Sequence, residues 1–400
     1  MTYVHRRIHD ADAHVMEMAD WLAPHADPEF SARLEKINIG GVSPEEQERL
    51  GKYHALHEDP EYRANDEAEL MLRKNWAATG SFLKEDRALA IDLLGFESQL
   101  IFNTFLNGEL LKAERSDDVA FAYGFARAHN RAMADFCSAD PRLLGTGYVP
   151  LRDFKRSKTA AQETIELGCR ALLVPGGCPR GHAHSHTGLD PVWAQAQEAG
   201  LPVVFHVGSG LRLVDNLLLD TDYFKNGQPT IQDFHGGDEN FRSVDYMAIP
   251  TAPMQTLATL IFDGVLDRFP TLRIGVIEQG ASWVPSWMRF MDSSFDAFRK
   301  GEERLQKLSM RPSDFVKRQI RVTPYPAEDA GWIIENSGET VCLFSSDYPH
   351  VEGGRNPIRR FEESLAETSE EAKQRFYYDN FADLMGSGLD GVPNPTGSND

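Results

Sequence analysis

The sequence of 400 residues predicts an α/β protein folded as a single TIM-like (β/α)8 barrel. Three observations support this prediction. Short apolar segments of strand length occur eight times, helical segments lie between nearly all of them, and several of the apolar segments end in Asp, Glu or His. Strands buried on both faces of a parallel sheet are typically near-continuous apolar runs. Strand alternating with helix throughout a chain favours a closed parallel barrel, whose functional residues lie at the C-terminal strand ends.

The eight expected strands lie near residues 7–14, 98–105, 142–151, 169–176, 201–207, 272–278, 319–325 and 341–346. Apolar residues at helical spacing predict helices over 121–137, 158–168, 191–200, 252–269 and 326–337. The alternative is an open doubly wound sheet, which usually carries a glycine-rich turn after its first strand. The stretch DADAHVME at 10–17 contains no glycine, which favours the barrel.

Two long segments interrupt the alternation of strands and helices. They are residues 18–66 after the first strand and residues 208–250 after the fifth. Both would leave the barrel on its active-site side, where long insertions usually form lids or pocket walls. We therefore expect one hydrolase-type barrel domain over 1–388. The tail 389–400 is rich in Gly, Pro and Ser, which predicts disorder.

The composition bears on partners and location. A formal charge of −20, from 41 basic and 61 acidic residues, argues against nucleic acids or anionic membranes as partners and is interpreted as promoting solubility. The four cysteines stand far apart without a CxxC motif, which fits a reducing cytosol. The N-terminus lacks the apolar core of a signal peptide, and no apolar run reaches about 20 residues. We expect a cytoplasmic homo-oligomer, a dimer or tetramer, that acts on a small molecule.

The first strand ends in Asp12 and His14, a carboxylate and an imidazole. Residues at i and i+2 of a strand share one face, so both side chains could point into the top of the barrel. Buried charges are costly unless they are paired or bound to a metal. Taken alone, the pair is equally compatible with capping by backbone donors. Asp10 shares the face but lies deeper, so it is interpreted as a structural hydrogen-bonding residue.

Two further strands end in residues of the same kind, His206 and Asp347. Alone, His206 would more often be a core histidine, and Asp347 a helix cap or turn residue. Together with the first strand they supply two imidazoles and two carboxylates. This mixture suits Zn²⁺, Mn²⁺ or Fe²⁺, whereas Mg²⁺ and Ca²⁺ prefer oxygen ligands.

The chain resembles the amidohydrolase superfamily, specifically its amidohydrolase-related (amidohydrolase 2) branch, which also contains metal-dependent non-oxidative decarboxylases. The matching segments come in family order from about residue 8 to 385: IHDADAHVME, NRAMADFCSADPRLLGTGYVPL, LPVVFH, VLDRFPTLRIGVIEQGASWVP and FSSDYPHVEG. The resemblance implies a β/α barrel with a catalytic divalent metal. It implies that Asp12 and His14 are the strand-one ligands, His206 is the strand-five ligand, and Asp347 both contacts the metal and moves protons.

The chain departs from the family pattern at two ligand positions. Asp12 replaces the usual first histidine, and Glu278 stands where many relatives have a strand-six histidine. Glu278 could be a general base if burial raises its pKa, could bind metal, or could orient a ligand. The strand-four end CRALLVPGG lacks the lysine that bridges two metals in many relatives. One ion of Zn, Fe or Mn is therefore expected rather than two. A two-ion site would need an unusual bridge such as Glu278.

Other polar and aromatic residues are candidates for contacts with the substrate. His350 follows Asp347 by three residues, and Trp283 follows Glu278 by five. The second insertion offers His235 and Arg212. The alternating histidines of GHAHSHTG are interpreted as a solvated loop rather than as ligands; they are His182, His184 and His186.

The predicted activity is metal-dependent hydrolysis of an amide, ester, lactone or thioester. The metal would lower the pKa of a bound water toward about 7, and Glu278 or Asp347 would move the protons. The alternative is non-oxidative decarboxylation of an aromatic or unsaturated acid with the same fold and ligands. Glu278 would repel such an anion unless protonated, and Arg212 is the available cation, so the sequence favours hydrolysis. A non-catalytic binding barrel would show broken ligand positions, and these are intact.

Overall fold

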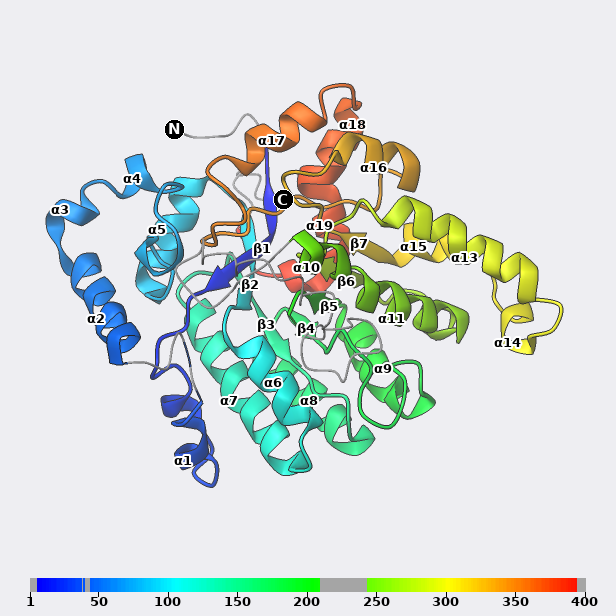
Figure 1. The fold of residues 1–400 in the computed structure, drawn as a ribbon, viewed down its shortest axis with the longest axis horizontal. Coiled ribbons are helices and arrows are strands. Elements are labelled where there is room, and N and C mark those ends of the chain that lie inside the picture. The colour runs from blue at the N-terminus through cyan, green and yellow to red at the C-terminus, as the bar shows by residue number, and fades with distance from the viewer. Residues whose placement is uncertain (1–5, 38, 40–43, 209–242, 394–400) are drawn as a thin grey trace, which may run out of the picture.

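The computed structural model describes residues 6–37, 39, 44–208 and 243–393. Seven parallel strands form one curled sheet in the order β1 to β7, with helices outside it (Figure 1). Every residue of these strands is buried, as expected for strands covered on both faces. The strands are β1 His9–Val15, β2 Ser98–Asn103, β3 Leu143–Tyr148, β4 Ala171–Leu173, β5 Val203–His206, β6 Ile274–Ile277 and β7 Ile320–Val322.

The segment 341–348 lies between the two edges of this sheet. Cys342 bridges to Val322 of β7, and Tyr348 bridges to Ala13 of β1, both in parallel. It occupies the place predicted for the eighth strand, although its backbone forms only isolated bridges. One reason is that the Ser346 amide donates to the Asp10 side-chain carboxylate (2.8 Å) rather than to a backbone carbonyl of a neighbouring strand. The arrangement is consistent with a TIM-like barrel.

Helices follow most strands and cover the outside of the sheet (Figure 1). They include α5 Lys84–Leu94, α6 Leu106–Arg115, α7 Val119–Cys137, α8 Phe154–Glu166, α9 Asp190–Ala199, α11 Thr251–Phe262, α12 Val265–Arg268, α13 Val284–Phe298, α14 Glu303–Gln306, α15 Pro312–Gln319, α16 Ala330–Ser337, α17 Pro357–Ser364, α18 Glu370–Gln374 and α19 Asn380–Met385. In Figure 1, α10 Ser243–Ala248 lies instead in front of the middle of the barrel, and its Tyr246 ring contacts Tyr325 with centroids 5.1 Å apart. The helix predicted over 252–269 is interrupted, because Gly264 adopts a φ of +72° between α11 and α12. Glycine reaches this left-handed conformation without a steric penalty.

The chain between β1 and β2 is largely helical and contacts the loop that follows residue 346. Before α5 it contains α1 Ser31–Leu34, α2 Pro44–Glu58, α3 Pro60–Arg63 and α4 Asp66–Glu69. Further on, the Asn75 amide donates to Pro349 O (3.0 Å), and the Tyr348 hydroxyl donates to Thr79 O (2.7 Å). These bonds hold residues 75–79 against the loop that carries Asp347.

The structure tests only part of the remaining predictions, which concern the insertions, the tail and the location of the protein. Residues 209–242, most of the second predicted insertion, and residues 394–400, most of the predicted tail, lie outside the described residues. Among the residues that are described, no helix is both long and apolar enough to span a bilayer. The oligomeric state and the cytoplasmic location stay predictions.

Glu114 of α6 joins this helix to the end of β3 and is expected to make stability pH-dependent. Its buried carboxyl accepts bonds from the Tyr148 hydroxyl (2.6 Å) and the Leu151 amide (2.8 Å). Burial raises the pKa of Glu114 from 4.5 to about 7. Between pH 4.5 and about pH 7 the folded state holds a proton on Glu114 that the unfolded state has lost. The contribution of Glu114 to the free energy of unfolding is therefore fully present below pH 4.5 and declines as pH rises toward about 7.

Glu114→Gln should remove this pH dependence of stability, because the glutamine side chain does not titrate. Its amide can donate to the Tyr148 hydroxyl, which then accepts instead of donating. As pH rises from 5 to 7.5, we expect the free energy of unfolding of the variant to increase by on the order of 1–3 kcal/mol relative to that of the wild type. Thermal unfolding at each pH would measure this difference. Glu109→Gln on the same helix is the control and should follow the wild type. Parallel stability profiles for Glu114→Gln and wild type would contradict the assignment.

Candidate metal centre

Asp12 and His14 lie near the C-terminal end of β1, and each is 1% exposed. Their side chains share one face of the strand, as alternation predicts, and His14 Nε2 lies 3.2 Å from Asp12 Oδ1. The register of β1 against β2 shifts between Asp10 and Ala13. Such bulges redirect side chains and are common beside functional sites. The first strand therefore presents a carboxylate and an imidazole as one buried pair.

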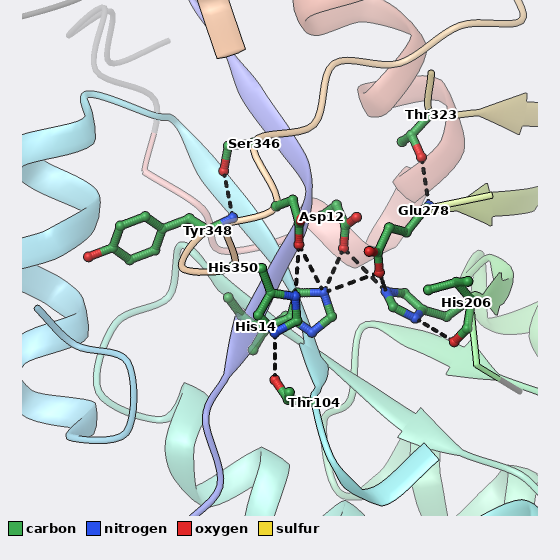
Figure 2. A network of polar contacts seen from close by, with 12 residues as sticks. Asp12, His14, Thr104, His206, Glu278, Thr323, Ser346, Tyr348 and His350 are labelled. Carbon is green, nitrogen blue, oxygen red and sulfur yellow. Dashed lines mark hydrogen bonds and ion pairs between the residues drawn. The ribbon is translucent and has the colours of Figure 1, made fainter. Parts of the chain in front are cut away.

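Three residues from other parts of the barrel join this pair (Figure 2). His206 ends β5, and its Nε2 lies 3.4 Å from Asp12 Oδ1 and 3.2 Å from Glu278 Oε2. Glu278 directly follows β6, and Asp347 lies near the end of the 341–348 segment in the eighth position. Asp347 Oδ1 lies 3.6 Å from His14 Nε2. The tertiary structure thus gathers five side chains that are up to 335 residues apart, from 12 to 347.

Backbone carbonyls set the direction in which the two imidazoles present their lone pairs. His14 Nδ1 lies 3.1 Å from Asn103 O, and His206 Nδ1 lies 3.0 Å from Val207 O. A carbonyl oxygen can only accept, so Nδ1 of His14 carries the proton and its neutral ring turns an Nε2 lone pair toward the cluster. His206 Nδ1 also lies 3.4 Å from the donor Asn107 Nδ2, but the nearer Val207 carbonyl favours the same tautomer. Burial lowers the pKa of His14 to about 4, which keeps it neutral at pH 7.

The cluster contains buried polar atoms with no hydrogen-bond partner among the described residues: Asp12 Oδ2, His14 Nε2 and Asp347 Oδ1. Buried acceptors and lone pairs that face one another are strongly unfavourable unless a cation lies between them. Asp12, His14, His206 and Glu278 each offer one ligand atom, and these atoms lie within 4.8 Å of one another. A mixed set of imidazole nitrogens and carboxylate oxygens fits Zn²⁺, Mn²⁺ or Fe²⁺.

Glu278 and Asp347 both adopt left-handed backbone conformations, each with a φ of +54°. This conformation is costly for residues other than glycine and concentrates at functional sites. Tertiary bonds hold both turns. The Glu278 amide donates to Thr323 Oγ1 (2.8 Å), the Tyr325 hydroxyl donates to Glu278 O (2.8 Å), and the Asp347 amide donates to Asp12 O (2.9 Å). Contacts from neighbouring strands and loops therefore hold both residues in this strained backbone conformation.

His350 lies within the same cluster rather than at its edge. It is 8% exposed, and its ring stacks on His14 with centroids 4.0 Å apart. Its Nδ1 lies 3.0 Å from Asp347 Oδ1, and its Nε2 lies 3.0 Å from Thr104 Oγ1. His14, Glu278, Asp347 and His350 form a second set of ligand atoms within 4.8 Å, overlapping the first. The residue predicted to contact substrate is thus also placed to contact metal.

Two buried carboxylates support the centre from below and beside it. Asp10 accepts from Gln99 Nε2 (2.8 Å) and from the Ser346 hydroxyl (2.6 Å), in agreement with the structural role expected of it. Glu17 accepts from the amide of Thr104 (3.0 Å). Burial raises the pKa of both carboxyls to about 7. These residues fix the first strand, the eighth segment and the loop after β2 to one another.

The other sequence candidates are not part of the ligand cluster or lie outside the described residues. Trp283 is half-buried at the start of α13, where its indole donates to Gly280 O (2.8 Å) and packs against Trp287. His235 and Arg212 fall in 209–242, outside the described residues.

The GHAHSHTG loop agrees only in part with the prediction of a solvated loop: His186 is exposed and His182 is half-buried. His184 is buried, with Nε2 2.7 Å from Pro175 O. His182 and His186 instead pack on the Phe154 ring, with centroids 4.5 and 4.6 Å away. Aromatic packing against α8 therefore orders a segment whose polar composition indicates solvent exposure. None of the three histidines belongs to the sets of ligand atoms found among the described residues.

Sequence reasoning missed Lys74, a cation from the chain between β1 and β2. Its Nζ donates to Gly354 O (2.6 Å) in the loop after Asp347. Burial lowers the pKa of Lys74 to about 8, against the opposing effect of the Asp347 and Glu352 charges. No motif marks this lysine. Only the packing of the first insertion on the 347–354 loop brings it near the centre.

A family model described as amidohydrolase matches residues 9–386, nearly the whole chain. The chain belongs to the amidohydrolase family. This confirms the resemblance inferred from the sequence. No curated protein matches the sequence significantly.

The fold is similar to solved structures of this kind. An amidohydrolase from Mycobacterium avium subsp. paratuberculosis K-10 aligns with a TM-score of 0.70 and 21% identity, covering 96% of this chain and 100% of that one. The manganese-bound 5-carboxyvanillate decarboxylase of Novosphingobium aromaticivorans aligns with a TM-score of 0.61 and 18% identity, covering 95% of both chains. The 2,6-dihydroxybenzoate decarboxylase from Rhizobium aligns with a TM-score of 0.61 and 16% identity, covering 95% of this chain and 98% of that one. At these identities the likeness shows the fold alone.

Proposed function

We propose that this amidohydrolase-family protein is a metal-dependent, non-oxidative decarboxylase of an aromatic or unsaturated carboxylic acid. The observation that carries the proposal is the buried cluster of lone-pair donors at the C-terminal ends of β1, β5 and β6. Structures of similar fold include several decarboxylases, three of them with manganese bound. This support reverses the preference for hydrolysis that the sequence suggested.

The first ion position consists of Asp12, His14 and His206, with Glu278 as the fourth residue. When bound, a divalent ion supplies positive charge that attracts and polarises the oxygen atoms of a substrate. The chain fixes this position through the Asn103 and Val207 carbonyls, which orient the two imidazoles. Such outer partners typically change metal affinity by about 10–100-fold when they are lost.

Asp347 is the residue we assign to proton transfer. Decarboxylation breaks the bond between the carboxyl carbon and its neighbour, CO₂ leaves, and the electron pair stays on the neighbouring carbon, which takes one proton. Asp347 lies in the cluster, and its Oδ1 is 3.6 Å from His14 Nε2 and 3.0 Å from His350 Nδ1. A carboxyl held there can donate that proton and then be reprotonated.

The site also needs to tolerate an anionic substrate beside three carboxylates. Lys74 supplies one positive charge near Asp347, through the loop contact to Gly354. The positive charge of Lys74 would offset part of the repulsion between Glu278 and an anionic substrate. We propose Lys74, Trp283 and His350 as residues that border the substrate, together with Arg212 and His235 from the second insertion.

Hydrolysis of an acyl substrate is the second candidate, and Glu278 is the observation that favours it. Its side chain is 13% exposed, and its Oε2 lies 3.2 Å from His206 Nε2. A carboxylate in that place could take a proton from an attacking water.

The two candidates differ in the bond that breaks, which gives a direct test. Protein loaded with Mn²⁺ would be incubated in D₂O with a panel of aromatic and unsaturated acids and a panel of amides, esters, lactones and thioesters. We expect CO₂ release from at least one acid, with one deuterium placed on the carbon that lost the carboxyl group. Metal-free protein is the control and should be inactive. Turnover of an acyl substrate with every acid left intact would overturn decarboxylation and favour hydrolysis.

A further inference from the structure

We infer that Asn107 is a positioning residue for His206. Its amide oxygen accepts the Nδ1 proton of this imidazole and so fixes the Nε2 lone pair toward the ion position. The inference rests on the ion position of the proposed function and does not depend on which reaction takes place there. Asn107 lies in the first turn of α6, and His206 ends β5.

The side chain of Asn107 is buried against His206 and the turn that follows it. Asn107 is 6% exposed, and its Nδ2 lies 3.4 Å from His206 Nδ1. A Cβ atom at Gly208 would lie 4.0 Å from Asn107 Cβ. The Phe102 ring also packs near His206, with ring centroids 4.4 Å apart. The imidazole therefore has an aromatic ring and a buried amide as neighbours, and the amide can direct its hydrogen bonding.

The hydrogen-bonding groups of Asn107 do not match those of a ligating His206. A ligand of an ion presents Nε2 without a proton, so the neutral ring carries its proton on Nδ1, as the Val207 carbonyl 3.0 Å away also favours. Asn107 Nδ2 is a donor, so two donors face each other at 3.4 Å. Asn107 Oδ1 is buried and has no hydrogen-bond partner among the described residues. Buried polar groups are rarely left in such a state.

A half-turn about the Cβ–Cγ bond of Asn107 removes this mismatch. It exchanges Oδ1 with Nδ2 almost without a change of shape, and this torsion is broad and roughly two-fold. Oδ1 then faces His206 Nδ1 and accepts its proton, which is shared with the Val207 carbonyl. Partners of this kind fix the tautomer and the orientation of a ligating imidazole and raise its basicity.

The first turn of α6 is held to the end of β1, which gives Asn107 a fixed base. Glu17 is fully buried, and its carboxylate accepts from the amides of Thr104 (3.0 Å) and Phe105 (3.2 Å). The helix dipole also favours a carboxylate at this end of α6. Asn107 thus links the end of β1 to the imidazole at the end of β5. A change at Asn107 should alter the orientation of His206 without unfolding the barrel.

The test measures Mn²⁺ affinity and the tautomer of His206 in the full-length protein. Metal-free protein would be titrated with Mn²⁺ by calorimetry. NMR of isotope-labelled histidine, with the His206 signals assigned by their loss in His206→Ala, would show which ring nitrogen carries the proton. We expect Nδ1–H in the wild type. Asn107→Leu keeps a similar shape but cannot accept, so Mn²⁺ should bind about 10-fold more weakly, and part of His206 should shift to the Nε2–H form.

Asn107→Asp is the conservative variant, because its carboxylate accepts the same proton. It should keep the Nδ1–H form and bind Mn²⁺ at least as tightly as the wild type. Asn336→Leu, which removes an exposed amide of α16, is the control and should match the wild type in both measurements.

The tautomer separates a hydrogen bond from packing, because a packing role would leave it unchanged. Unchanged affinity in Asn107→Leu, or weaker affinity with an unchanged tautomer, would overturn the inference and leave the ion position standing. Mn²⁺ binding by Asn107→Asp as weak as by Asn107→Leu would do the same. If no variant folds, a wild-type His206 protonated on Nε2 would still overturn it. No bound Mn²⁺ in the wild type would overturn both the inference and the ion position.

Discussion

His206→Ala is expected to lose most of the bound metal and to lower kcat by about 10³-fold or more, because a metal supplies several kcal/mol to such reactions. His206 Nε2 lies 3.2 Å from Glu278 Oε2 and 3.4 Å from Asp12 Oδ1, so the imidazole links two carboxylates of the first position. Without it, those carboxylates face each other with fewer ligands for a cation. Elemental analysis of the purified protein and kinetics with added Mn²⁺ would measure both effects.

His186→Ala is the matched control, because His186 is exposed and packs on Phe154 away from the cluster. It should retain wild-type metal and turnover. If His206→Ala kept a full complement of metal after dialysis against a chelator, His206 could not be a ligand and the first ion position would be wrong.

Glu278→Gln is expected to lower kcat by about 10²–10⁴-fold while at least one ion stays bound. The amide has nearly the shape of the carboxylate but lacks its negative charge, so it is a weaker fourth residue of the ion position. In the hydrolytic alternative it also cannot take the proton of the attacking water. The turn should survive, because Thr323 and Tyr325 bind the Glu278 backbone and not its side chain. Kinetics and metal content per chain, measured on the same preparation, separate lost proton transfer from lost metal.

The control is Glu335→Gln on α16, an exposed carboxylate whose loss should leave turnover unchanged. Unchanged turnover in Glu278→Gln would refute a role in proton transfer or metal binding and leave Glu278 as a residue that orients a ligand.

Much of the candidate centre follows from strand endings in the sequence. Alternation on the first strand places Asp12 and His14 on one face, and parallel strands bring their C-terminal ends to one rim, where His206 ends β5. The family resemblance supplied the correspondence of Glu278 and Asp347. The depth of Asp10 along β1 correctly indicated a structural role.

Other features were not predictable because they depend on contacts between remote segments. His350 was expected at the substrate, yet it stacks on His14 and faces Asp347, since Thr104 from the end of β2 anchors its ring. Lys74 approaches the centre through its bond to Gly354. The interruption between α11 and α12 depends on one glycine that helical periodicity alone ignores.

By itself, the amino-acid sequence determined the order of strands and helices and the polar residues that end the strands, because periodicity and composition record which side of an element is buried. Only the tertiary structure decided how those residues combine. Curling of the sheet brings β1, β5, β6 and the 341–348 segment together, and carbonyls from other residues orient the imidazoles. Distances and lone-pair directions arise from packing between segments far apart in the chain, and no local pattern encodes them.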